Sequence, residues 1–225
     1  MLCNYYFQQK GRIYVPPKQK YTRESILETA LQIAKRDGLS AVVARNVGAE
    51  LGCTVSPIFS YFKNMEELQQ AVKDEALKLF KEQISSQNLY TADLKMQCIQ
   101  MVNFAKEKPE LFKIIFESKT SLESLKDVIN EYVPDFENGI NSLVTSQGVS
   151  HEAALLIYEQ LWVQAYGLSS LIASSVIEIP SEEDVSSSIN HLFNSEIMFI
   201  KSEMAEMAAS RPSARSVVKV SVKSK

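Results

Sequence analysis

The chain of 225 residues is poor in the side chains that bind metals or form disulfide frameworks. Its three cysteines, Cys3, Cys53 and Cys98, are too few and odd in number for such a framework, and their spacing matches no zinc site. The two histidines, His151 and His191, lie far apart in the sequence. We therefore predict no metal and no cofactor. Cysteines this sparse are typical of a protein in the reducing cytoplasm.

The sequence also lacks an uninterrupted apolar run of the length, about 18 residues, that a membrane-spanning helix needs. Its most apolar stretch, residues 153–179, is interrupted by Glu159, Gln160 and Gln164. There is no glycine-rich phosphate loop, no pair of histidines at metal spacing and no Ser-His-Asp grouping. His151 and Glu159 could act as acid and base, but surface or capping roles are more common for such residues. An enzyme is therefore disfavoured, and we predict no catalytic residue.

Charge is distributed unevenly along the chain, although the net charge is only −3. From Lys10 to Asn64, nine lysines and arginines stand against four acidic residues, a net charge of +5. From Met65 to Ser210, ten stand against twenty-three, a net charge of −13. A basic N-terminal part on an acidic body is typical of a protein that presents one end to phosphate groups.

Strand signals are scarce, whereas apolar residues recur at helical spacing along most of the chain. Capping residues and Pro or Gly at the ends of these segments set the expected helix boundaries. The predicted fold is all-α, with a three-helix DNA-binding head on a bundle of about six helices. Outside the head's second and third helices, the expected helices are Arg23–Asp37, one from the Asn64 cap to Ser85-Ser86, Leu94–Lys106, one beginning at Pro109, Leu122–Ser146 with a kink or break at Pro134, one from the Ser150 cap to Ser174, and one beginning after Pro180.

Residues 42–68 predict two short helices joined by a tight turn. Val47 and Leu51 belong to the apolar stripe of the first helix, and Gly52 ends it, since glycine readily adopts the left-handed conformation that often follows a helix. Thr54 is predicted to cap the second helix, and Pro57 falls in its first turn. We expect three residues to pack inward and three to face outward: Ile58, Phe59 and Phe62 inward, Val55, Ser56 and Ser60 outward. This pattern is typical of a helix-turn-helix motif.

The same segment resembles the recognition segment of the TetR/AcrR family of bacterial transcriptional regulators. The matching residues are Leu51-Gly52, Cys53-Thr54, Ile58-Phe59, Tyr61-Phe62 and Met65-Glu66-Glu67-Leu68. The close match covers residues 16–70. Two departures concern phosphate contacts: Phe59 lacks the usual tyrosine hydroxyl, and Met65 replaces the usual lysine.

The resemblance implies a homodimeric regulator that binds a near-palindromic DNA operator and acts as a ligand-responsive repressor. Control by a protein partner, or by no ligand, is an alternative within the binding proteins. A helical enzyme is the alternative from another class.

Candidate DNA contacts follow from the side-chain types in and around the predicted motif. Serine hydroxyls and a valine methyl suit base edges, and basic or hydroxyl side chains suit phosphates. The groove-facing candidates are Val55, Ser56 and Ser60, beside Pro57; the phosphate candidates are Arg45, Thr54, Tyr61 and Lys63, together with Lys18 and Lys20 in the N-terminal arm. For Tyr61, packing within the head is the alternative, and for the lysines the alternative is a solvated surface.

Two further sets of residues belong to the expected body. Met and aromatic side chains adapt to varied apolar ligands, so they could line an effector pocket, with a filled core as the alternative. These are Met96, Met101, Phe104, Phe112, Phe116, Phe136, Trp162 and Tyr166. The resemblance places the dimer interface on the last two helices, where Gly167 would allow close approach, with intrachain packing as the alternative. These residues are Gly167, Leu171, Leu192, Phe193 and Ile197.

The expected organisation is a flexible basic arm over residues 1–20, the DNA-binding domain over 21–66, the effector and dimerisation domain over 67–209, and a disordered basic tail over 210–225. Val15-Pro16-Pro17-Lys18 aligns with Met-Pro-Pro-Lys at the start of resembling proteins. A valine codon can be GUG, a bacterial start codon. We therefore predict that the native protein begins at Val15, read as Met, and that residues 1–14 are leader sequence; a start at Met1 is the alternative.

Overall fold

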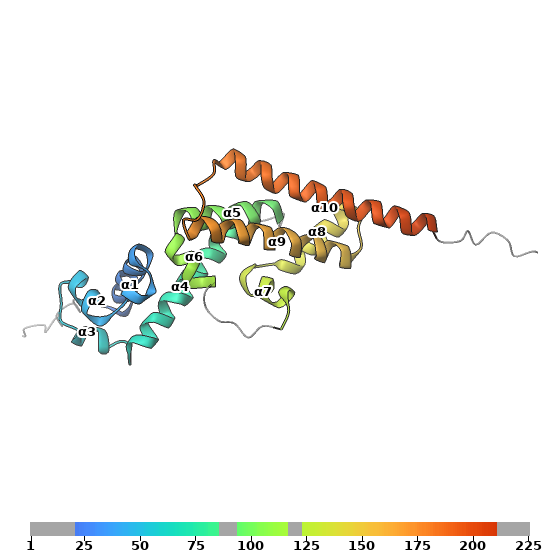
Figure 1. The fold of residues 1–225 in the computed structure, drawn as a ribbon. Coiled ribbons are helices and arrows are strands. Elements are labelled where there is room, and N and C mark those ends of the chain that lie inside the picture. Colours follow the sequence, from blue (N-terminus) through green and yellow to red (C-terminus); the bar gives the residue numbers. More distant parts are fainter. Residues whose placement is uncertain (1–20, 86–93, 117–122, 211–225) are drawn as a thin grey trace, which may run out of the picture.

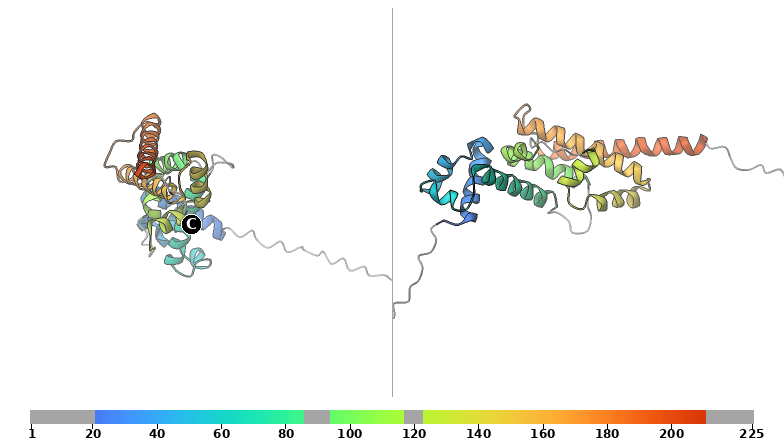
Figure 2. Two further views of the ribbon diagram at one scale, coloured as in Figure 1. Left: turned by 90° about the vertical axis from the view of Figure 1, so that its right-hand side faces the viewer. Right: turned by 90° about the horizontal axis from the view of Figure 1, so that it is seen from below.

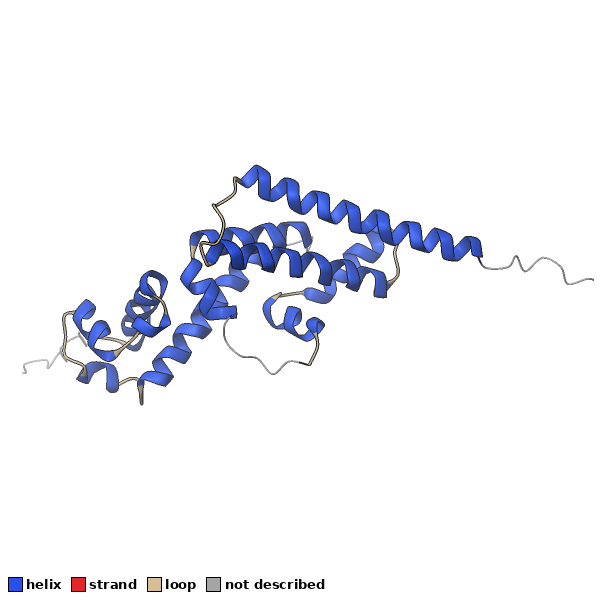
Figure 3. Ribbon diagram, in the orientation of Figure 1, coloured by secondary structure: helices blue, strands red, loops and turns tan. Residues whose placement is uncertain are grey.

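The structure is a computed structural model that describes residues 21–85, 94–116 and 123–210, with side chains described as far as Glu206. The predicted arm with Lys18 and Lys20, and the predicted tail beyond Ser210, lie outside the described residues. All described regular elements are helices, so the prediction of an all-α fold is confirmed (Figure 3).

The helices form an elongated molecule (Figure 1). We call residues 21–64 the head and residues 65–210 the body. The head contains α1 (Arg23–Asp37), the short 3-10 helix η1 (Leu39–Ala41), α2 (Ala44–Leu51) and α3 (Ser56–Phe59). The body contains α4 (Met65–Ser85), α5 (Leu94–Glu107), α6 (Pro109–Phe116), α7 (Leu125–Tyr132), α8 (Phe136–Gln147), α9 (His151–Ala173) and α10 (Glu182–Ser210). The head and the C-terminal end of α10 lie at opposite ends of the molecule (Figure 2).

Side-chain caps begin several of these helices at the predicted residues. The Thr22 hydroxyl accepts from the Ser25 amide at 3.1 Å at the start of α1. At the start of α4, Asn64 Oδ1 accepts from the Glu67 amide at 2.8 Å. The Ser150 hydroxyl accepts from the Ala153 amide at 3.2 Å and begins α9. These bonds satisfy amides that no helix carbonyl can reach.

Pro134 breaks the helix expected over 122–146 into α7 and α8. Proline has no backbone N–H and its ring clashes with the preceding turn, so a helix cannot continue through it undisturbed. The chain turns at Asp135, which has a left-handed φ of 57°, and α8 begins at Phe136. The break lets α8 pack against α9 while α7 contacts α9 separately.

The buried apolar residues form one continuous cluster from Ile26 in α1 to Ile200 in α10. In the body, α5 packs along α9, and α10 contacts both of them. The head meets the body through α4 and through α6, which packs against α1. At that contact a Cβ on Gly38 would lie 3.1 Å from Glu110 Oε2, so the end of α1 closely approaches the start of α6.

Candidate nucleic-acid interface

The turn between α2 and α3 is held by backbone contacts around two glycines. Gly52 has a φ of 65°, in the left-handed region, as its position after α2 predicted. The Cys53 amide donates to the Gly48 carbonyl at 2.9 Å. A Cβ on Gly48 would lie 3.0 Å from the Cys53 carbonyl oxygen, so a side chain there would require the turn to shift by a few tenths of an ångström. Sequence reasoning missed Gly48, although a glycine inside a short helix is a signal of close approach.

The inner side of α3 is anchored by Ile58, which is fully buried, and by Phe62, which is 1% exposed. The predicted inward position of Phe59 is wrong, because its side chain is 46% exposed. Ile58 and Phe62 are four residues apart and share the buried side, whereas Phe59 lies about 100° around the helix from Ile58.

The predicted cap at Thr54 is also wrong. The helix begins one residue later than this cap requires, with Val55 at the N-cap position and no side-chain hydrogen bond there. Thr54, Val55, Ser56 and Ser60 are all exposed, and Pro57 is half-buried in the first turn. The Ser60 hydroxyl donates to the Ser56 carbonyl at 3.1 Å, so its proton is already used within the helix.

Tyr61 connects the end of α3 to the start of α1. Its hydroxyl donates to the Tyr21 carbonyl at 2.9 Å, and its ring is half-buried against the core. The structure therefore favours packing within the head for Tyr61. Through this bond it holds Tyr21, just before α1, against the end of α3.

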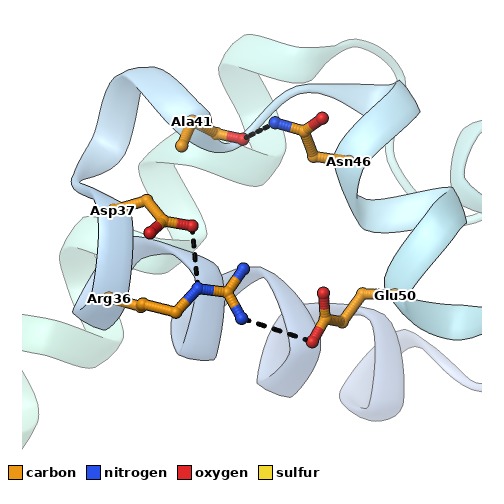
Figure 4. A network of polar contacts seen from close by, with 5 residues as sticks. All are labelled: Arg36, Asp37, Ala41, Asn46 and Glu50. Carbon is orange, nitrogen blue, oxygen red and sulfur yellow. Dashed lines mark hydrogen bonds and ion pairs between the residues drawn. The ribbon is translucent and has the colours of Figure 1, made fainter.

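Arg36 at the end of α1 is engaged by two carboxylates of the head. Arg36 Nε lies 2.9 Å from Asp37 Oδ2, and its Nη1 lies 3.5 Å from Glu50 Oε1 (Figure 4). Beside this network, the Asn46 amide donates to the Ala41 carbonyl at 2.9 Å (Figure 4). These exposed contacts orient α2 against the end of α1 and contribute little stability by themselves.

The remaining arginine of α1, Arg23, lies with its guanidinium 4.8 Å from the centre of the Phe62 ring. By contrast, Arg45 and Lys63 are exposed, and neither forms an ion pair within the part of the chain that the structure describes. The Lys63 amide donates to Glu67 Oε2 at 2.7 Å, which fixes its backbone at the start of α4. Both side chains are therefore available to an external anion.

Five of the eight predicted pocket residues belong to one group of touching aromatic rings in the body. We call this group the aromatic cluster: Phe80, Phe104, Phe112, Phe116, Tyr132, Trp162 and Tyr166. Trp162 and Tyr166 stack with centroids 5.6 Å apart and planes 6° apart. Sequence reasoning missed Phe80 and Tyr132, which come from α4 and α7. Burial raises the pKa of the Tyr132 phenol, which keeps it neutral.

The other three predicted pocket residues lie elsewhere or are packed in the core. Phe136 packs edge-on against Tyr158, with centroids 4.9 Å apart, so this ring contact lies outside the aromatic cluster. Met101 is 2% exposed within α5. Met96 is half-buried, and the Gln100 amide lies 3.7 Å from its sulfur.

Trp162 carries the most unusual feature of the aromatic cluster. Its side chain is 5% exposed, yet its indole Nε1 is buried without a hydrogen-bond partner among the described residues. Leaving such a donor unpaired costs about 1–3 kcal/mol. A polar acceptor brought to this position would therefore gain more than an ordinary surface hydrogen bond.

The predicted dimer residues divide between two faces of the last helices. Gly167 and Leu171 are exposed on α9, and Leu192 on α10 is half-buried. Phe193 and Ile197 are only 9% and 8% exposed because they pack against the chain's own core, which corrects their assignment to an interface. Sequence reasoning missed Met198 and Phe199, which are 73% and 57% exposed on α10.

The described residues contain no group of three or more His, Cys, Asp and Glu side chains that could hold a metal ion. His151 Nε2 lies 3.6 Å from Glu137 Oε2 at the start of α9, an exposed position typical of a surface ion pair. Among the described helices, none is both long and apolar enough to cross a membrane.

Comparison with known proteins found no protein-family model and no curated protein that matches the chain. The arguments for function therefore depend on the geometry of the head and body and on the resemblance of residues 51–68.

Proposed function

We propose that this protein is a cytoplasmic DNA-binding transcriptional regulator that inserts α3 into the major groove of a near-palindromic operator. The observation that carries this proposal is the outer face of α3. Ile58 and Phe62 pack one side of this segment against the core of the head, and the side chains on its other side are exposed. A helix presented in this way fits a groove about 12 Å wide, which admits an α-helix. The resemblance to TetR/AcrR regulators supports the same function and suggests repression.

Charge supports the same orientation. Arg45 at the start of α2 and Lys63 just after α3 are exposed and free of ion pairs within the described residues. The body, with its net charge of −13 over residues 65–210, would be repelled by the phosphate backbone. DNA would therefore approach the head and not the body.

Homodimer formation is part of the proposal, because two equivalent recognition helices explain a near-palindromic site. Exposed apolar side chains on α9 and α10 support it: Leu171, Met198 and Phe199 are 43%, 73% and 57% exposed. Gly167 adds an open position on α9, where a Cβ would meet nothing within 4 Å in the chain itself. Sedimentation of the full chain tests self-association directly.

A duplex library of random sequence provides the test of DNA binding. The full chain should enrich a near-palindromic motif from this library after repeated selection. An enzyme or a protein-binding module would enrich none. The motif can then be located upstream of genes in the native genome, and the sign of regulation measured with a reporter.

Alanine at Arg45 or Lys63 should weaken binding to all duplexes alike. Each contact neutralises a phosphate, so each loss should lower the slope of log affinity against log salt by about one unit per contact. Selectivity between the enriched motif and random DNA should stay constant. Lys201→Ala, on the exposed surface of α10, is the matched control and should leave both affinity and slope unchanged. If the slope of log affinity against log salt were unchanged in both head variants, neither Arg45 nor Lys63 would contact a phosphate.

We also propose that an apolar, neutral or cationic effector lowers the DNA affinity by binding at the aromatic cluster. Trp162 Nε1, which has no hydrogen-bond partner within the described parts of the chain, supports a ligand that carries a hydrogen-bond acceptor, and the net charge of the body disfavours anions. The ligand must bind more tightly in the DNA-incompetent state, and a tenfold loss of DNA affinity needs a coupling of about 1.4 kcal/mol. Without such a ligand, control by a protein partner is the alternative.

Trp162 is the only tryptophan in the chain, so its fluorescence reports directly on the aromatic cluster. A panel of hydrophobic cations and neutral amphiphiles should include members that change this fluorescence and reduce DNA affinity in the same concentration range. An effective ligand with a carbonyl group should bind about fivefold more tightly than its alkyl isostere, because one hydrogen bond contributes roughly 1 kcal/mol. If ligands changed the Trp162 fluorescence but left the DNA affinity unchanged, binding at the aromatic cluster would not regulate DNA binding.

A further inference from the structure

The outer face of α3 exposes two apolar side chains, although the helix is only four residues long. Phe59 is 46% exposed and Val55 is 42% exposed. They are four residues apart, so their side chains lie on the same side of the helix turn. Neither belongs to the apolar residues packed against the core. Two apolar side chains are thus held in water by a helix whose buried contacts are already made by other residues.

The same segment is poor in side chains that could read bases by hydrogen bonds. Residues 53–62, CTVSPIFSYF, contain no arginine, lysine, asparagine or glutamine, which make the usual two-point contacts with guanine or adenine. Ser60 donates its proton to the Ser56 carbonyl, and Tyr61 donates to the Tyr21 carbonyl. The exposed hydroxyls of Thr54 and Ser56 remain able to contact base edges, but each makes at most a one-point contact, so apolar contact is the larger means of direct readout on this face.

Only one base displays an apolar group at the edge of the major groove of unmodified DNA, and that group is the 5-methyl of thymine. A phenyl ring covers a methyl group over a wide range of angles, and a valine one turn away can cover a second. An exposed phenyl ring facing a guanine or cytosine edge would instead strip water from polar atoms without replacing their hydrogen bonds. The chemistry of this face therefore selects thymine over the other bases.

We propose that Phe59 is a specificity-determining residue that contacts the 5-methyl group of a thymine in each half-site, with Val55 supplying a second apolar contact. This inference rests on the proposed DNA-binding function and adds the chemical group that is read.

Deoxyuridine tests the contact because it differs from deoxythymidine only by the 5-methyl group. The probe is the tightest duplex enriched from the random library, with each thymine replaced in turn by uracil in both half-sites. At two positions, one assigned to Phe59 and one to Val55, the affinity should fall. At the Phe59 position the fall should be roughly fourfold per methyl group, the value expected for burying one methyl. At thymines that are not contacted the affinity should not change.

Phe59→Ala should lower affinity for the thymine duplex and remove the difference between the thymine and uracil duplexes at that position. Phe59→Leu keeps an apolar side chain and should retain part of the difference. Leu125→Ala, which truncates an exposed apolar side chain on α7, is the matched control, and its thymine-to-uracil ratio should equal that of the parent. Helical circular dichroism of each variant checks that the head is folded.

The outcomes separate this inference from the function on which it rests. Failure to enrich any duplex would overturn both. Tight binding of an enriched duplex with no effect of uracil at any position would overturn the inference and leave the DNA-binding function standing. So would a full thymine-to-uracil difference that persists at every thymine position in folded Phe59→Ala.

Discussion

Replacing Phe80 by alanine should lower the free energy of unfolding by about 3–5 kcal/mol, the range for removing a buried phenylalanine ring. Phe80 lies on α4 and is fully buried. Its ring packs edge-on against Phe104, with centroids 5.2 Å apart, and against Phe116 at 5.4 Å. Alanine would remove the contacts of both rings and leave a void that close-packed helices fill only in part.

This loss should be a large fraction of the total free energy of unfolding, because native proteins are stable by only about 5–15 kcal/mol. Urea unfolding followed by circular dichroism, at one fixed protein concentration and without DNA, gives the free energy. Phe80→Leu keeps much of the volume and should show a smaller loss in the same direction.

Phe59→Ala is the matched control for this measurement. It removes the same ring from an exposed position on α3, so without DNA the free energy of unfolding should change by no more than about 0.5 kcal/mol. Equal losses for Phe80→Ala and Phe59→Ala would contradict the burial of Phe80 and the exposure of Phe59 together.

The local features of this fold were predictable because their causes lie within a few residues of one another. The caps at Thr22, Asn64 and Ser150 each act on an amide three residues ahead. Pro134 breaks a helix through its own ring and missing N–H. Such signals require no knowledge of what the helix packs against.

The position of Phe59 could not be predicted from hydrophobicity, because Ile58, Phe59 and Phe62 are all apolar and α3 has only four residues. With so short a helix, periodicity does not decide which side faces the core. The same difficulty occurs on α10, where Phe193 and Ile197 face the core while Met198 and Phe199 face solvent. Apolar residues surround that part of the helix, so only its packing against α5 and α9 separates the two sets.

The aromatic cluster shows a different limit, which comes from distance along the chain. Its rings are contributed by α4, α5, α6, α7 and α9. A list of aromatic residues in the body includes most of its members, but it cannot show that Phe80 and Tyr132 complete the cluster or that Phe136 packs against Tyr158 instead. Those contacts depend on how the helices cross, which no local pattern specifies.

Gly48→Val should disrupt the head and with it any DNA binding. The substitution places a Cβ 3.0 Å from the Cys53 carbonyl oxygen and 3.7 Å from the Thr54 carbonyl group. These are backbone atoms, which cannot rotate aside as a side chain can. The turn would therefore have to move from α2 by a few tenths of an ångström, and we expect α3 to move with it.

The expected loss in the free energy of unfolding is about 1–3 kcal/mol, the usual range for forcing extra atoms into a packed site. DNA affinity should fall at least tenfold at a temperature where circular dichroism shows the body folded, because the recognition helix would no longer be held in position. Binding to the enriched duplex and thermal unfolding of the same sample measure both effects.

Ala49→Val is the control, because it introduces the same β-branched side chain at the next residue of α2, where the side chain is exposed. Valine lowers helix propensity similarly at the two positions, so this contribution largely cancels. If Gly48→Val and Ala49→Val matched each other in both stability and DNA affinity, the close approach of the turn to α2 would not be what positions α3. If Gly48→Val alone lost stability and DNA affinity, the missing side chain at Gly48 would be what allows α3, the helix that we propose reads DNA, to take its position.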